Sequence, residues 1–379
     1  MKKNLLKRIG AVALAVAVSL TMGTAAFAAD TIDDQTTVGA AGDSVTFTDT
    51  FTISDGDNAQ NLPAAAFNYA IAPGTGAAAT ATSPLIKAGI GSPTITNASH
   101  SATAAGTTTN SVDVTADFSG VTFTEAGIYR YDVTETKGSS SVSVDIAIDV
   151  DNSNKGTYIL DVYVKKNGSD FEPYAYVLSK TGAITQTETE EEIKETYSDK
   201  VDTIKNEYTT YDLTVSKTIE GDMAANEFDF TVNVASVPTD AFVQQDSETA
   251  VAGSESGNTF TKTLKTGEST VIKGLPSTAT YAIQEAVNQL EGYKVEVVDN
   301  NTNPGTYNWI GTTDAATAYG NSTAATLGKA DVTVAFTNTL NSISPTNVVM
   351  RFAPYLFILG AAIVLLVLMR RRRASRDTE

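Results

Sequence analysis

The stretch that decides the fold is DVTVAFTNTL, residues 331–340. Side chains alternate between the two faces of a strand, so one face carries Val332, Val334 and Phe336 and then Asn338. A carboxamide buried in such an apolar row costs roughly 1–3 kcal/mol unless it finds hydrogen-bond partners. Two other runs have a polar side chain at a comparable inward position, and this indicates that Asn338 belongs to a group of buried polar residues.

Short alternating runs rich in Thr, Val, Tyr and Phe fill most of the chain. Examples are SVTFTDTFTIS (44–54), YDLTVSKTI (211–219) and TYAIQEA (280–286). Such runs with turn residues between them are typical of antiparallel sheets in sandwich domains. We therefore predict an all-β protein with two tandem Ig-like or B-repeat-like β-sandwich domains, residues 29–208 and 209–341.

The two ends of the chain predict export and a membrane anchor. Residues 1–28 combine lysines, an apolar run and the small-x-small pattern Ala26-Phe27-Ala28, which together predict a secretory signal peptide. Residues 352–369 are long and apolar enough to cross a bilayer as a helix, and Arg370–Arg373 follow on the predicted cytoplasmic side. We thus expect an exported protein that spans the membrane at least transiently.

Composition excludes several function classes. The chain has 26 Lys and Arg against 44 Asp and Glu, and without residues 1–28 and 347–379 the counts are 16 and 42. So acidic a surface repels nucleic acid and anionic lipid. There is no cysteine, so disulfides and thiol nucleophiles are excluded. The single histidine, His100, has no sequence neighbours suited to a triad or metal site, and we predict no metal site or cofactor.

Three strands of the second domain each point one reactive group inward. Lys217 follows Val215 on the face of the opening strand, Glu285 follows Ile283, and Asn338 lies in the closing strand. Burial lowers the pKa of a lysine and raises that of a glutamate, so a neutral amine can attack the Asn338 carboxamide while Glu285 transfers protons. The prediction is a Lys217–Asn338 amide; the alternative is a set of buried hydrogen bonds.

The motifs LTVSKTIEGDMA, FDFTV, YAIQE and VAFTNT follow one another in this order within residues 213–340. This part resembles the isopeptide-linkage domains of Gram-positive pilins, the streptococcal backbone-pilin type with collagen-adhesin B-like folds. The resemblance implies Lys217 and Asn338 as the bonded pair and Glu285 as the catalytic acid.

The first domain repeats the pattern with one departure. GIYRYDVTET and KNEYTTYDLTV also resemble the pilin family and imply Glu135 and Asn206 as the equivalents of the acid and the amide. Asp49, however, stands where the family has lysine, and no lysine occurs between Arg8 and Lys87. We expect an unlinked cluster of Asp49, Glu135 and Asn206; the alternative is a lysine from another strand, such as Lys166, beside Asp49.

Residues 342–379 resemble a sortase sorting signal: ISPTNVVMRFAPYLF (343–357), a hydrophobic span and an arginine-rich tail. The motif would be Ser344, Pro345, Thr346 and Asn347; Ser344 and Asn347 depart from the usual form, which has glycine in the place of Asn347. The resemblance implies that a sortase cleaves after Thr346. The Thr346 carbonyl is then joined to the lysine of a neighbouring pilin or to peptidoglycan. The alternative is a permanent single-pass anchor.

Polymerisation by that route requires an exposed lysine near the end of the first domain. Lys200 lies six residues before Asn206 and is the first candidate, with Lys194 and Lys205 as alternatives. The surrounding acidic run, residues 187–200, predicts a solvated loop or a short helix.

These features predict a structural pilus (fimbrial) subunit on the surface of a Gram-positive bacterium. Its partners would be sortase and neighbouring subunits or peptidoglycan, and it would be no enzyme apart from one autocatalytic bond. The alternative is a monomeric, wall-anchored adhesin or stalk that binds a host or matrix ligand.

Overall fold

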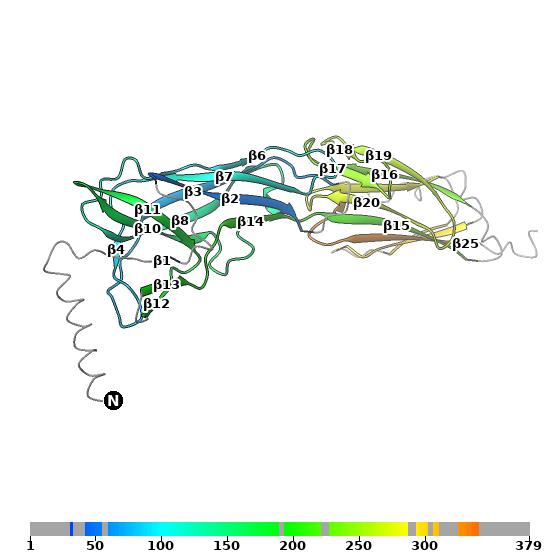
Figure 1. Cartoon of the computed structure of the whole chain (residues 1–379). Coiled ribbons are helices and arrows are strands. Elements are labelled where there is room, and N and C mark those ends of the chain that lie inside the picture. Colours follow the sequence, from blue (N-terminus) through cyan, green and yellow to red (C-terminus); the bar gives the residue numbers. More distant parts are fainter. Residues whose placement is uncertain are drawn as a thin grey trace, which may run out of the picture. The chain divides into compact units, whose positions relative to one another are not determined.

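The computed structural model describes residues 31–32, 42–54, 60–188, 193–220, 227–286, 293–301, 306–310 and 325–340. It confirms the all-β fold, with two compact units whose boundary in the chain lies between Thr210 and Tyr211, apart from short pieces of residues 238–252 (Figure 1). The predicted signal peptide, 1–28, and sorting segment, 342–379, lie outside the described residues. Within the described ranges, no helix is long and apolar enough to cross a membrane.

The first unit contains two large sheets and one small sheet. The five-stranded sheet has the order β5 (Thr94–Ile95), β7 (Thr109–Asp117), β2 (Ser44–Ile53), β14 (Thr203–Tyr208) and β9 (Ile146–Ala147). The six-stranded sheet has the order β11 (Asp170–Ser179), β10 (Thr157–Asn167), β8 (Gly127–Ser140), β3 (Ala65–Pro73) and β6 (Ala98–His100), with β4 (Ile86–Ala88) beside β8. A short 3-10 helix, η1 (Ser143–Asp145), precedes β9.

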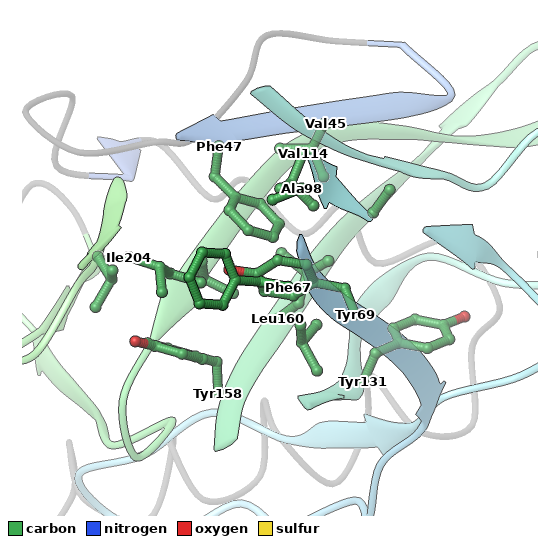
Figure 2. Packing of buried hydrophobic residues seen from close by; sticks show 14 of the residues in the cluster. Val45, Phe47, Phe67, Tyr69, Ala98, Val114, Tyr131, Tyr158, Leu160 and Ile204 are labelled. Atoms are coloured by element: carbon green, nitrogen blue, oxygen red, sulfur yellow. The ribbon is translucent and has the colours of Figure 1, made fainter. Parts of the chain in front are cut away.

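Alternating burial builds the core between these two sheets. Along β2, Val45, Phe47, Asp49, Phe51 and Ile53 are buried and the intervening residues face outward. Their apolar members pack with residues from the six-stranded sheet in one hydrophobic cluster. Figure 2 shows this packing. Asp49 is therefore a carboxyl group in the middle of a hydrocarbon layer.

The small sheet has the order β1 (Thr31–Ile32), β13 (Ile193–Tyr197) and β12 (Ile184–Glu188). Part of the acidic run is therefore strand, so the prediction of a loop or a short helix for residues 187–200 was wrong there. Tyr197 of β13 and Ile184 of β12 are buried with Tyr163 of β10 in a second, smaller apolar cluster. That apolar contact favours a strand where charge alone suggested a solvated segment.

The second unit contains most strands of a seven-stranded sheet and all of a four-stranded sheet. The larger has the order β18 (Val251–Ala252), β17 (Phe242–Gln245), β20 (Ser269–Leu275), β15 (Tyr211–Glu220), β25 (Val332–Leu340), β22 (Tyr293–Asp299) and β23 (Thr306–Ile310). The smaller has the order β19 (Asn258–Leu264), β16 (Phe228–Ala235), β21 (Thr280–Glu285) and β24 (Ala325–Thr326).

The opening and closing strands of each unit pair in parallel, β2 with β14 and β15 with β25. The prediction of antiparallel sheets was wrong for these two pairs. Side-chain alternation has the same period in both kinds of pairing, so the sequence pattern does not distinguish them. The parallel pairs set the opening and closing strands side by side in each core.

Candidate functional site

Strand register brings the three predicted residues of the second unit together. Lys217 on β15 lies opposite Phe336 on β25, and Asn338 lies opposite Ile219, so lysine and asparagine are diagonal neighbours on one inward face. Glu285 ends β21 in the other sheet and lies opposite Phe230 of β16. Lys217, Glu285 and Asn338, hereafter the second-unit cluster, are each at most 1% exposed.

One carboxylate oxygen joins the other two members of this cluster. Lys217 Nζ donates to Glu285 Oε1 at 2.7 Å, and Asn338 Nδ2 donates to the same oxygen at 2.7 Å. Glu285 Oε2 and Asn338 Oδ1 are buried and have no hydrogen-bond partner among the described residues. The amine and the carboxamide therefore meet at one acid, which is the arrangement that proton transfer between them requires.

Burial shifts both ionisable groups toward their neutral forms. Desolvation lowers the pKa of Lys217 to about 8, against the opposing attraction of Glu285. Desolvation likewise raises the pKa of Glu285, opposed by its contacts with Lys217 and Asn338. The rings of Phe228 and Phe230 lie 4.5 and 5.8 Å from Lys217 Nζ and keep water away from it.

The first unit repeats the register at the positions equivalent to the three members of the second-unit cluster. Asp49 lies opposite Ile204 and Asn206 lies opposite Phe51, so Asp49 and Asn206 are diagonal neighbours as Lys217 and Asn338 are. Glu135 on β8 lies opposite Tyr69 of β3, the position that Phe230 has opposite Glu285. Asp49 therefore occupies the place of the lysine.

Three side chains lie within hydrogen-bond distance of the Asp49 carboxyl group. Asn206 Nδ2 lies 3.1 and 3.2 Å from its two oxygens, the Tyr69 hydroxyl donates at 2.6 Å, and His100 Nε2 lies 3.0 Å from Oδ1. Asn206 Nδ2 also donates to Glu135 Oε1 at 2.8 Å. Lys166, proposed as an alternative partner of Asp49, is exposed near the end of β10, so that alternative was wrong.

His100 and Tyr69 complete what is hereafter the first-unit cluster: Asp49, Tyr69, His100, Glu135 and Asn206. His100 is 2% exposed and packs between the rings of Phe51 and Phe67, and the sequence did not predict its contact with Asp49. Tyr69 could have been found from the alternation of β3, which turns it inward after Phe67. His100 ends a strand of three residues, too short for any periodic signal.

A turn before β10 fixes the orientation of the Asn206 carboxamide. The backbone amide of Asp149 donates to Asn206 Oδ1 at 2.9 Å, so the NH₂ group faces the two acids. Asp149 has a φ of 49° and is held by Gly156 N, which donates to Oδ2 at 2.6 Å, and by the Tyr158 hydroxyl. A side chain at Gly156 would come within 2.6 Å of the Glu135 carbonyl, so the close approach requires glycine.

The candidate polymerising lysines differ in their surroundings. Lys200 is partly exposed, its Nζ lies 6.0 Å from the centre of the Tyr197 ring, and its backbone pairs with Ser179. Lys205 forms an ion pair with Asp151 at 2.7 Å. Lys194 belongs to β13, but its side chain lies outside the described residues, as do Ser344, Pro345, Thr346 and Asn347. No group of three or more potential metal ligands occurs in the part of the chain that the structure describes.

Comparisons with known proteins agree with this division into two units. Residues 46–209 match the family model described as Spy0128-like isopeptide containing domain, and residues 211–340 match a domain family of unknown function. The first unit is therefore similar in sequence to isopeptide containing domains, although Asp49 stands at the lysine position. No curated protein sequence matches the chain.

The overall fold is that of Gram-positive major pilins. The chain is similar to the crystal structure of the major pilin from Streptococcus pyogenes, with 22% identity, a TM-score of 0.55, and coverage of 80% of this chain and 99% of that one. It is also similar to the major pilin T3.2 from S. pyogenes serotype GAS13637, with 23% identity, a TM-score of 0.52, and coverage of 80% and 100%. The predicted resemblance to backbone pilins is thus confirmed.

Proposed function

We propose that this chain is a structural subunit of a surface pilus whose second domain is closed by one Lys217–Asn338 isopeptide bond. The observation that carries the proposal is the Glu285 oxygen that accepts hydrogen bonds from both the amine and the carboxamide, inside a core with no exposed member. The pilin fold of the whole chain supports the structural role.

The reaction needs no outside reagent. The neutral Lys217 amine attacks the Asn338 carboxamide carbon, with the carboxamide turned so that its oxygen meets the protonated Glu285. A new C–N bond forms, Glu285 relays the amine proton to Nδ2, and ammonia leaves as the old C–N bond breaks. Burial of the cluster excludes the water that would otherwise compete.

Intact-mass spectrometry tests the bond. We expect the folded protein to be about 17 Da lighter than its sequence mass, the loss of one ammonia. Glu285→Gln keeps the shape of the side chain but cannot relay the proton, so its mass should match the sequence. Glu296→Gln, at a partly exposed position of β22, is the matched control and should retain the loss. A folded wild type with unmodified mass would contradict the proposal.

The first domain, by the same reasoning, is held without a covalent bond. Asp49 cannot act as an amine nucleophile, and its partners Tyr69, His100 and Asn206 supply hydrogen bonds only. A pilus subunit with one linked and one unlinked domain follows. Peptide mapping that finds Asp49 joined to a lysine would overturn this part.

For export and assembly, we propose that a sortase cleaves after Thr346 and joins it to Lys200 of a neighbouring subunit, or to peptidoglycan at the base. Lys200 is favoured because it lies six residues before Asn206, near the end of the first domain, and is partly exposed. The backbone of Lys200 is tied to β11, which holds the side chain on a fixed scaffold.

A further inference from the structure

The first-unit cluster has more hydrogen-bond acceptor contacts than the Tyr69 hydroxyl, with its one proton, can satisfy. The Tyr69 hydroxyl has one proton, yet its oxygen lies 2.6 Å from Asp49 Oδ2 and 3.1 Å from Glu135 Oε1. That proton serves the shorter contact. The longer contact is a hydrogen bond only if Glu135 itself donates, and a protonated Oε1 can donate to Tyr69 while it accepts from Asn206.

We propose that the first domain is stabilised by a proton instead of a covalent bond: protonated Glu135 donates to Tyr69, and Tyr69 donates to Asp49. Acid therefore strengthens this proton-dependent contact, and alkali weakens it. The inference does not depend on the bond proposed for the second domain.

The remaining members of the cluster fit this proton arrangement. Asp49 accepts from Tyr69 and Asn206, and His100 Nε2 lies 3.0 Å from its Oδ1. Glu135 has one buried oxygen, Oε2, without a partner among the described residues, so ionisation would leave charge there uncompensated.

The groups that face Glu135 come from every neighbouring element. They are Asp49 on β2, Tyr69 on β3, Asp149 in the turn before β10 and Tyr158 on β10, with His100 beyond Asp49. Burial raises the pKa of Glu135 to about 8, and the nearby acids Asp49 and Asp149 act in the same direction.

The sign of the pH effect follows from this pKa. The ordinary value for Glu is 4.5, so between pH 4.5 and about 8 the folded state holds a proton that the unfolded state has released. Stability from this group is therefore complete below pH 4.5 and is lost as the pH rises toward 8.

Thermal unfolding of the purified protein between pH 5 and 9 tests this proton-dependent contact. We expect the transition of the first domain to fall by roughly 5–10 °C from pH 5 to pH 8 and then to level off. Glu135→Gln should flatten this dependence, since its amide side chain does not titrate in this pH range. Glu207→Gln, on β14 beside Asn206 and partly exposed, is the matched control and should behave as the wild type does.

Two measurements on the protein keep the test independent of variant folding. In the wild type, hydrogen exchange in peptides from β2, β8 and β14 should be faster at pH 8 than at pH 6 after correction for intrinsic rates. His100 is the only histidine in the sequence, so its ¹⁵N signals need no assignment and should show a proton on Nε2. Equal exchange at both pH values, a Nε2 without a proton, or an unchanged pH dependence in Glu135→Gln would each overturn the proposal.

Discussion

At the residue scale, the two clusters differ at a few positions of a shared register. Asp49 replaces Lys217 and Tyr69 replaces Phe230, and His100 comes from a short strand at the sheet edge. An acid in place of the amine removes the nucleophile but leaves the acid and the carboxamide in position. Tyr69 and His100 then supply the donors that a buried carboxylate needs.

Restoring the lysine should restore the chemistry. The Asp49→Lys variant places an amine where Asn206 Nδ2 now lies 3.1 Å from Asp49 Oδ1, with Glu135 Oε1 2.8 Å from the same nitrogen. We expect a second ammonia loss of about 17 Da by intact mass. Asp113→Lys, which adds a lysine at an exposed site on β7, should lose only the first. If folded Asp49→Lys shows only the first ammonia loss, the Asn206 carboxamide carbon is out of reach of the amine.

At the element scale, parallel pairing of the first and last strands explains why the bond would stabilise the second domain. β15 and β25 are adjacent in the sheet but separated by nearly the whole domain in sequence. A cross-link between them closes a loop of about 120 residues, and the entropy model gives such a closure about 5 kcal/mol. In the proposed assignment, the same pairing of β2 and β14 in the first domain has no such closure.

Lys217→Met should therefore weaken the second domain sharply. The variant removes the amine but keeps a long apolar side chain, and we expect the melting temperature of that domain to fall by about 15 °C. Lys294→Met, at a partly exposed position on β22, serves as the control and should change little. Scanning calorimetry measures both. Similar melting of Lys217→Met and wild type would mean that the bond is absent or does not affect stability.

At the scale of the whole molecule, the two units share a fold but differ in how their cores are closed. The first is held by hydrogen bonds to a buried carboxylate, and the second by the proposed covalent bond. Since a buried polar cluster contributes only a modest net free energy, the first domain should open before the second.

Heating at pH 8 should show that order. We expect protease cleavage sites to appear within residues 42–208 at a lower temperature than within residues 211–340, because the first domain as proposed has no cross-link and its Glu135 is about half ionised at this pH. Limited proteolysis with mass mapping of the fragments measures this. Earlier cleavage in the second domain would contradict the assignment of the linked and unlinked units.

Assembly gives a separate prediction for the whole chain. Cells that express the protein with its own sortase should produce a ladder of covalent polymers in boiled detergent gels. Thr346→Ala should reduce the ladder to monomer. Lys200→Arg should also reduce the ladder to monomer, but the monomer should still be attached to the wall. Lys205→Arg is the control, since Lys205 is paired with Asp151. A ladder that survives Thr346→Ala would place the cleavage site elsewhere.

The sequence by itself determined the all-β class, the division near residue 210, and the inward positions of Lys217, Glu285 and Asn338, because alternation with period two assigns each side chain to a face. It also placed Asp49 in the row that holds lysine elsewhere. Only the tertiary structure decided that the opening and closing strands pair in parallel, and that Tyr69 and His100 reach Asp49. Strand partners and contacts between sheets depend on packing across the core. A local pattern does not record this packing, least of all in a strand as short as β6.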